Sequence, residues 1–414
     1  MSFLFNALYK SKVERLMSIQ NISVQTHSVP NTPAWSAVAV MSLCCSVLIA
    51  SEFMPVSLLT PIALDLNMSE GQVGQAIAIS GIFAVISSLT IAKIAKNWNR
   101  RHVILGLTLL MIISGIIITF AHNASLFMLG RAILGIVIGG FWAISTAIVI
   151  RLVPEVYVPK ALGLLNGGNA LAATVAAPLG SFLGAIIGWR GAFFCIIPIA
   201  IIALFWQFKT MPSLPPRLNT QQESANGFLL LKKPMVSFGM LGILFLFMGQ
   251  FALFTYLRPF LERVTLVDTN TLSTLLLVLG LTGLAGTFII SNLLHQHVFR
   301  YLIFIPVSMA TIALAFIYFG HQLWFVAVLM ALWGFIGTSA PVAWNTWLTK
   351  TLPNDVEAGG GLMVAIIQLA ITLGATLGGL LFDTQGYQAT FLLSAFILFL
   401  SGIFAFFSRK FSRS

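Results

Sequence analysis

Long apolar runs alternate with short polar breaks along most of the chain. A helix needs about 20 apolar residues to cross about 30 Å of hydrocarbon. Backbone polar groups in lipid must be satisfied within the segment, which favours helices. The sequence therefore predicts an all-α membrane protein with twelve transmembrane helices, over residues 36–60, 72–95, 103–121, 125–150, 161–186, 191–208, 235–258, 271–293, 301–319, 323–348, 359–382 and 389–407.

Composition supports the membrane class. Hydrophobic residues make up 58 % of the 414 residues and charged residues 8 %, with a mean hydropathy of +0.97. Soluble proteins carry about 25 % charged residues, so an ordinary soluble globule is excluded. The 34 Phe and 9 Trp exclude a disordered chain.

The basic residues are distributed unevenly between the two sides of the predicted bundle. Of the 22 Lys and Arg residues, two (Arg190 and Arg263) lie on one side, and two (Arg131 and Arg258) fall inside or at the ends of spans. The remaining 18 lie on the side of the two chain termini. The positive-inside rule therefore predicts that both termini are cytoplasmic. The net charge of +11 is interpreted as a topology signal, with no nucleic-acid partner expected.

A polar, proline-containing stretch divides the chain into two halves. We expect a cytoplasmic tail (1–34), a six-helix bundle (35–208), a cytoplasmic linker (209–234), a second six-helix bundle (235–407) and a short cytoplasmic tail (408–414).

A shift of 198 residues aligns the two halves in separate places. It pairs Glu52-Phe53 with Gln250-Phe251, and Pro61 with Pro259. The same shift pairs Gly163-Leu164 with Gly361-Leu362. Two related bundles can rock about a site at the middle of the membrane, so the repeat predicts pseudo-symmetric halves around a central site.

Two charged residues fall deep inside spans, where a charge is costly. Glu52 lies about 24 Å from the cytoplasmic end of span 1, and Arg131 lies about 21 Å from that end in span 4. They are therefore expected at one depth. In the functional interpretation, Glu52 exchanges a proton and Arg131 modulates it. In the structural alternative, the two form a permanent ion pair.

Further candidates are polar or aromatic residues within spans. Gln250 occupies the repeat position of Glu52, and Gln368 and Asn169 are amides on other helices. Trp142 and Tyr256 could stack on a planar ligand. Each could instead serve helix packing. Arg258, Glu262 and Arg263 lie at the outer end of span 7 and are interpreted as snorkelling or interfacial groups.

Motifs for enzymatic chemistry are missing from the sequence. There is no Gly-Lys dipeptide of a Walker phosphate loop, no Cys-x-x-Cys and no His-Glu-x-x-His. We therefore expect no catalytic residues, no metal site and no cofactor.

Twelve spans in two repeated halves, with the basic pair Arg100-Arg101 in the loop after span 2, resemble the major facilitator superfamily, and within it the drug:proton antiporter group. Leu129–Gly135 (Leu-Gly-Arg-Ala-Ile-Leu-Gly) is similar to the span-4 motif of that group, whose Arg is implicated in proton coupling. Ala177–Ser181 (Ala-Pro-Leu-Gly-Ser) is similar to the span-5 antiporter motif, which usually reads Gly-Pro followed by Gly-Gly. In the loop after span 2, Lys96 stands where the family normally carries an Asp.

Within the superfamily, the chain most resembles bacterial efflux pumps for purine ribonucleosides, from about residue 34 to 407. The resemblance rests on Glu52–Pro61, Gly139–Ala143, Gly249–Tyr256 and Ile367–Ala370. It implies proton-driven export of purine nucleosides across the bacterial inner membrane, with spans 1, 4, 7 and 10 lining the cavity. Related sugar exporters share the Glu-Phe and Phe-Trp elements.

The resulting hypothesis is a multi-pass inner-membrane exporter, expected as a monomer, that works by proton antiport with alternating access. Its partners are a small-molecule substrate, protons and the lipid bilayer. Glu52 and Arg131 are the candidates for proton coupling, and the candidate substrate contacts are Gln250, Gln368, Asn169, Trp142 and Tyr256. Two alternatives remain: efflux of sugars or drugs on the same fold, and a membrane protein that does not transport.

Overall fold

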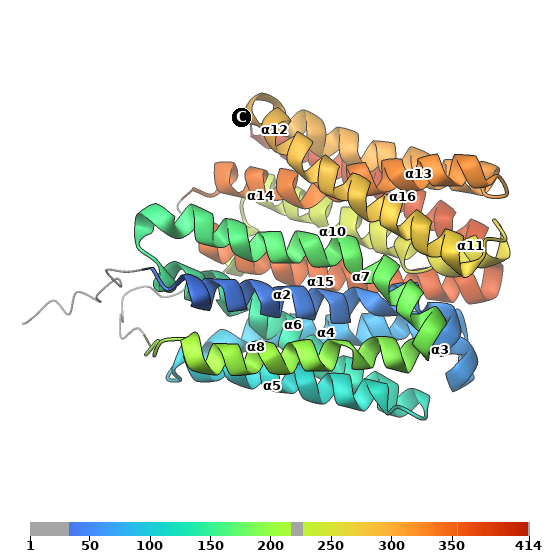
Figure 1. Cartoon of the computed structure of the whole chain (residues 1–414). Coiled ribbons are helices and arrows are strands. Elements are labelled where there is room, and N and C mark those ends of the chain that lie inside the picture. The colour runs from blue at the N-terminus through green and yellow to red at the C-terminus, as the bar shows by residue number, and fades with distance from the viewer. Residues whose placement is uncertain (1–32, 217–226, 354, 413–414) are drawn as a thin grey trace, which may run out of the picture.

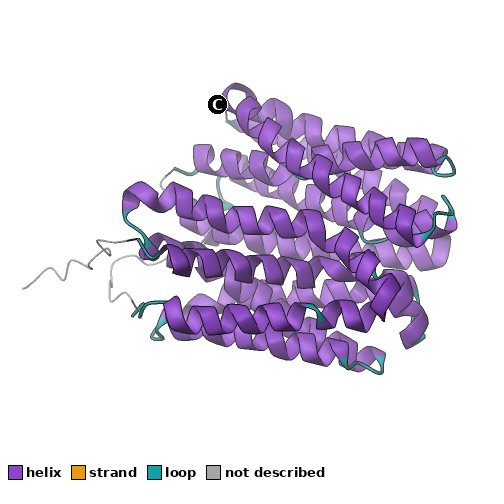
Figure 2. Cartoon of the chain, in the orientation of Figure 1, coloured by secondary structure: helices purple, strands orange, loops and turns teal. Residues whose placement is uncertain are grey.

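The computed structural model describes residues 33–216, 227–353 and 355–412, and all regular structure in these ranges is helical (Figure 2). Most of the expected N-terminal tail (residues 1–32) lies outside the described residues, as do part of the expected linker (217–226) and the end of the C-terminal tail. The last helix runs to Phe411, four residues beyond the predicted end of span 12.

The helices fall into two sets along the chain (Figure 1). The N-terminal half contains α2 (Trp35–Ser57), α3 (Leu59–Leu66), α4 (Glu70–Ile94), α5 (Arg100–Thr119), α6 (Ala124–Leu152), η1 (Glu155–Tyr157), α7 (Val158–Phe194) and α8 (Ile196–Thr210). The C-terminal half contains α9 (Gly227–Leu230), α10 (Pro234–Phe254), α11 (Leu257–Arg263), α12 (Thr269–Phe319), α13 (Leu323–Gly337), α14 (Ser339–Thr351), α15 (Val356–Gln385) and α16 (Tyr387–Phe411).

Within the described residues, eleven helical segments are long and apolar enough to cross a membrane. One of them, Glu155–Thr210, is 56 residues long and covers the predicted spans 5 and 6. The backbone turns at Gly188 (φ 73°, ψ 165°), a conformation that essentially only glycine adopts. This segment therefore accounts for two crossings, in agreement with the predicted twelve-helix, two-bundle fold.

The internal repeat is visible in the backbone itself. The two glycines with positive φ in the described chain are Gly188 and Gly386, and they are 198 residues apart. Span 1 breaks at Leu58 (φ −116°, ψ 10°) and span 7 breaks at Tyr256 (φ −103°, ψ 14°), again 198 residues apart. The two halves thus share local geometry that their apolar composition alone would not impose.

Helix packing follows the same symmetry. In the N-terminal half α2 packs on α7, and in the C-terminal half α10 packs on α15. Between the halves, α4 packs on α15 and α7 packs on α12. Gly135 and Gly139 of α6 lie so close to the backbone of α4 that a Cβ would meet the carbonyl oxygens of Ser80 and Ala84. Close backbone approach at small residues is typical of helix packing in membranes.

The two ends of the bundle differ in how the halves meet. We call the end at which α2 begins and α16 finishes the tail end, and the opposite end, with α3 and α11, the far end (Figure 1). Near the tail end, the core around α2, α5 and α6 contains buried residues of the N-terminal half only. At the far end, one core joins Leu58 and Phe127 with Tyr256 and Phe382 of the other half.

Polar contacts between the halves show the same difference. Seven hydrogen bonds or ion pairs join described residues of the two halves between the middle of the bundle and the far end. These contacts are Glu52–Gln368, Ala78–Thr372, Ser57–Arg258, Glu70–Arg263, Ser69–Asp383, Gly71–Asp383 and Ser181–Ser273. The described halves are therefore fastened together at the far end.

Candidate functional site

A proline determines the local structure around the candidate carboxylate. Pro55 lies inside α2 and has no N–H, so the carbonyl of Ser51 loses its helical hydrogen-bond donor. The Arg131 Nη1 atom of α6 donates to that carbonyl at 2.8 Å, and its Nη2 donates to the carbonyl of Glu52 at 3.3 Å. Its Nε donates to the carbonyl of Ala76 in α4 at 3.3 Å. Arg131 therefore ties α6 to α4 and to the turn of α2 that precedes Pro55.

Arg131 is 0 % exposed, so its charge lies wholly inside the bundle. Its contacts agree with the prediction that Glu52 and Arg131 share one depth. The described residues contain no ion pair between the Arg131 guanidinium and the Glu52 carboxylate within 4.0 Å, because the guanidinium donates to backbone carbonyls instead. The geometry thus differs from the permanent ion pair of the structural alternative.

The Glu52 carboxylate faces the other half of the molecule. Its side chain is buried, with 6 % of the residue exposed, and its Oε1 accepts a long hydrogen bond from the Gln368 Nε2 of α15 at 3.5 Å. A bond of this length is weak. Glu52 and Gln368, two of the predicted site residues, are therefore brought together across the interface between the halves.

Two of the candidate residues have a buried amide oxygen with no partner among the described residues. These oxygens are the Oε1 atoms of Gln368 and of Gln250, the repeat counterpart of Glu52. Gln250 lies on α10 beside Gly337 of α13. A buried acceptor left without a hydrogen bond costs about 1–3 kcal/mol. Both oxygens are therefore suited to accept hydrogen bonds from a ligand or from water.

Aromatic residues next to these polar groups also meet across the halves. Phe53 of α2 stacks on Phe251 of α10, with ring centroids 5.8 Å apart and an interplanar angle of 22°. Phe254 contacts Phe251 edge to face. Phe53 and Phe251 are not among the site residues expected from the sequence, although the 198-residue repeat pairs them and could have identified them.

The structure places the remaining candidates at separate positions. Asn169 is half-buried on α7, and the half-buried Trp142 of α6 contacts Phe141 edge to face. Tyr256 is 0 % exposed and its hydroxyl donates to the carbonyl of Ala375 at 2.7 Å. It packs against Gly74 of α4, so it belongs to the far-end contact between the halves.

The interfacial interpretation of Arg258 is wrong. This residue is only 7 % exposed, and its Nη1 donates to the carbonyl of Ser57 in the other half. Its Nε pairs with Glu262 at 2.8 Å. The sequence could place Arg258 at the end of a span, but it could not show that α2 ends opposite it.

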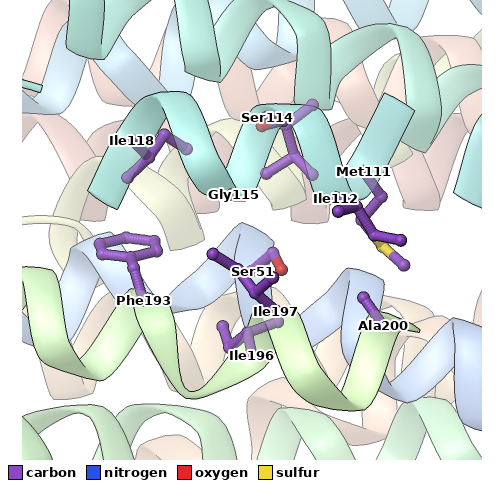
Figure 3. Close-up of a pocket in the computed structure, with 11 residues that line it drawn as sticks. Ser51, Met111, Ile112, Ser114, Gly115, Ile118, Phe193, Ile196, Ile197 and Ala200 are labelled. Atoms are coloured by element: carbon purple, nitrogen blue, oxygen red, sulfur yellow. The ribbon is translucent and has the colours of Figure 1, made fainter. Parts of the chain in front are cut away.

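A small cavity lies beside Ser51 of α2, between α2, α5 and α8 (Figure 3). Ser51, Ser114 and Phe193 are among the residues that line it, and its volume is about 10 Å³. That volume is close to the minimum for one water molecule. The cavity is therefore too small for an organic ligand, and the candidate site remains the interface around Glu52.

Comparisons with known proteins agree with the fold. The family model described as Major Facilitator Superfamily matches residues 41–358 and, in an overlapping match, 300–414. The chain is 51 % identical over 389 residues to the "Transcription regulatory protein OpdE" of Pseudomonas aeruginosa, covering 93 % of this chain and 96 % of the relative. It is 40 % identical over 371 residues to the "Purine ribonucleoside efflux pump NepI" of Salmonella paratyphi B, covering 90 % and 93 %.

Solved structures with the same fold include transporters. A bacterial homologue of the human lysosomal transporter Spinster, in an inward-facing and unoccupied conformation, superimposes with a TM-score of 0.74 at 15 % identity and covers 93 % of this chain and 98 % of its own. A D-xylose–proton symporter gives a TM-score of 0.73 at 16 % identity, covering 90 % and 97 %. At these identities the likeness concerns the fold alone.

Proposed function

The chain belongs to the Major Facilitator Superfamily, and from this premise we propose that it exports purine ribonucleosides in exchange for protons by alternating access. The single observation that carries the proposal is the buried Glu52 carboxylate at the interface of two pseudo-symmetric halves, held by one weak bond to Gln368. The 40 % identical relative named as a purine ribonucleoside efflux pump supports the substrate class.

The arrangement of the halves supports alternating access. The halves are fastened at the far end, while the core around α2, α5 and α6 near the tail end contains buried residues of the N-terminal half only. Two related bundles that are closed at the far end can rock about the central interface. Rocking would open the far end and close the tail end. If the tail end is cytoplasmic, as the basic residues predict, the conformation closed at the far end would receive a substrate from the cytoplasm.

The position of Glu52 supports proton coupling. Parting the halves at the far end separates Glu52 from Gln368 and lets water reach the carboxylate. A change between a buried and a hydrated environment alters the proton affinity of a carboxyl group. Arg131 stays on the Glu52 side of the interface, because its hydrogen bonds go to α2 and α4 of the same half.

The polar groups at the interface favour an uncharged ligand rich in hydrogen-bond donors. Gln250 and Gln368 each offer an unpaired amide oxygen, and Glu52 offers carboxylate oxygens. Arg131 is engaged by three backbone carbonyls, so its guanidinium is poorly placed to bind an anion. The hydroxyl and N–H groups of a nucleoside match such acceptors.

Substitution of the carboxylate tests the coupling. Glu52→Gln in proteoliposomes is expected to abolish inosine accumulation driven by a pH gradient and to retain inosine counterflow, because the amide cannot exchange a proton. Glu155→Gln is the matched control, since Glu155 is exposed in η1 at the tail end. Full uphill transport by the Glu52→Gln variant would remove Glu52 from the mechanism.

Substrate choice separates the proposal from other efflux functions. Counterflow with inosine, arabinose and a cationic dye at two pH values should show saturable inosine exchange that arabinose and the dye do not inhibit. Preferred exchange of arabinose or of the dye would favour sugar or multidrug efflux instead.

A second candidate function, a membrane protein that regulates without transporting, is favoured by one observation. The 51 % identical relative carries the name "Transcription regulatory protein". If folded, reconstituted protein moves none of the three compounds, while deletion of its gene changes transcript levels, the regulatory function would be supported. Counterflow of inosine would count against it.

Placement and assembly belong to the same proposal. Both termini are expected on the cytoplasmic side of the bacterial inner membrane, because the basic side chains cluster at that side. A fluorescent protein fused to the C-terminus should therefore mature in cells, and light scattering in detergent should give the mass of one chain. Fluorescence only from a fusion placed on the opposite side of the membrane would show that the orientation is reversed.

A further inference from the structure

The stacked rings of Phe53 and Phe251 lie at the centre of the interface between the halves. They come from α2 and α10, are related by the 198-residue repeat, and follow Glu52 and Gln250 directly in the sequence. Phe53 packs against the core of each half, so it bridges the two. An aromatic pair is thus built next to the polar groups of the candidate site.

The order of contacts along α2 places this pair at the bottom of the interface as seen from the tail end. Glu52 meets Gln368, then Phe53 meets Phe251, and then Ser57 meets Arg258. Beyond Ser57 the far-end contacts follow, beginning with Tyr256 against Gly74. A molecule that enters between the halves from the tail end therefore reaches these two rings before it reaches the fastened far end.

We propose that Phe53 and Phe251 form a stacking platform for the base of a purine nucleoside. This inference rests on the proposed function and names the residues that would select a flat heteroaromatic ligand over a sugar. Phe53, which is half-buried, is the more accessible ring, and Phe251 supports it from the other half. The unpaired oxygens of Gln250 and Gln368 would accept hydrogen bonds from the base or the ribose.

The platform also accounts for selectivity in physical terms. Bases stack on aromatic side chains with little dependence on base identity, because every base has a π face. A ribose or arabinose has no π face, so it cannot stack in this way and gains less from the rings. Removal of an aromatic ring should therefore weaken nucleoside binding and leave the binding of a base-free riboside unchanged.

The test uses the full chain in proteoliposomes and measures inosine counterflow. Phe53→Leu and Phe251→Leu remove one ring each, and Phe53→Trp keeps an aromatic face. Phe238→Leu is the control, because Phe238 stacks on Phe404 of α16, away from Glu52. In Phe53→Leu and Phe251→Leu, the half-saturation concentration for inosine is expected to rise about tenfold, which corresponds to about 1.4 kcal/mol. In Phe53→Trp and Phe238→Leu it should be nearly unchanged.

A second measurement distinguishes a stacking platform from an apolar plug, in which the two rings only block the path between the halves. Inhibition of inosine counterflow by methyl β-riboside should be as strong in Phe53→Leu as in the unsubstituted protein. An unchanged half-saturation concentration for inosine in both Leu variants, with only a lower maximal rate or a proton leak, would overturn the platform and identify a plug. If the unsubstituted protein shows no inosine counterflow, the proposed function itself fails, and that outcome is distinct from failure of the platform.

Discussion

At the scale of single residues, Arg131 is a fully buried charge that donates hydrogen bonds to backbone carbonyls of two other helices. Its depth follows from counting residues in span 4, and the contacts with the carbonyls of Ser51 and Glu52 agree with that depth. Its partners depend on the rotation of three helices and on the carbonyl that Pro55 leaves without a donor. Those features emerge only from packing, so the sequence suggested a carboxylate partner where the structure has backbone oxygens.

Arg131→Met is expected to destabilise the protein strongly, by about 3 kcal/mol or more, because it leaves buried carbonyls without their charged donor. Arg131→Lys keeps the charge but lacks the planar, multiply donating guanidinium group. Its stability should therefore lie between that of Arg131→Met and that of the unsubstituted protein. Thermal unfolding in detergent measures both. Arg300→Met is the matched control because Arg300 is exposed. Equal unfolding temperatures for Arg131→Met and Arg300→Met would contradict this role.

At the scale of helices, the polarity pattern predicts the spans well but not their ends or breaks. Span 1 is a pair of helices, α2 and α3, divided at Leu58, and span 7 is divided in the same way at Tyr256. The chain stays apolar on both sides of Leu58, so hydropathy carries no signal for that break. The 198-residue repeat does carry one, because a break in one half implies a break in the other.

Gly74 of α4 makes room for the Tyr256 hydroxyl between the halves. Gly74→Ala would place a methyl group on that hydroxyl, so the far end should close less often and cysteines placed there should react faster with thiol reagents. Gly163→Ala is the control because no atom lies within 4 Å of its added Cβ. Combining Gly74→Ala with Tyr256→Phe removes the colliding oxygen but leaves the ring carbon Cζ 2.7 Å from the added Cβ, so labelling should become slower than in Gly74→Ala alone without returning to the original rate. Equally fast labelling in the double variant would refute the steric explanation.

Gly188 and Gly386 both adopt positive φ in open space, where nothing within 4 Å would meet an added Cβ. Alanine at either position would be strained without colliding, at a cost of about 1–3 kcal/mol. Gly188→Ala and Gly386→Ala should therefore lower the unfolding temperature by similar amounts. A lower unfolding temperature in only one of the two variants would show that the halves do not use these turns equivalently.

At the scale of the whole molecule, a few polar contacts hold the two halves together at the far end. The Asp383 carboxylate of α15 accepts hydrogen bonds from the Ser69 hydroxyl at 2.5 Å and the Gly71 N–H at 3.0 Å, at the N-terminus of α4. A carboxylate is favourable at a helix N-terminus. No residue pattern could predict this contact, because its partners are more than 300 residues apart in the chain.

Asp383→Asn removes the charge from this contact and should shift the equilibrium toward an open far end by about five- to tenfold, or about 1–1.4 kcal/mol. Pulsed electron paramagnetic resonance between spin labels at the far ends of the two halves would report the longer distance. Asp65→Asn is the control because the ion pair of Asp65 with Arg190 (2.6 Å) lies within one half. The same distance distribution in Asp383→Asn and Asp65→Asn would rule out Asp383 as a fastener.

The ion pair between Glu70 and Arg263 belongs to the same far-end set, and the Arg263 side chain is 59 % exposed. Exposed charges are screened by dissolved salt, whereas a buried group such as Glu52 is screened much less. The ionic strength of the solution at the far end would thus act directly on how readily the two halves part there. A change from dilute to saline solution on that side would then alter how often the halves separate without any other protein taking part.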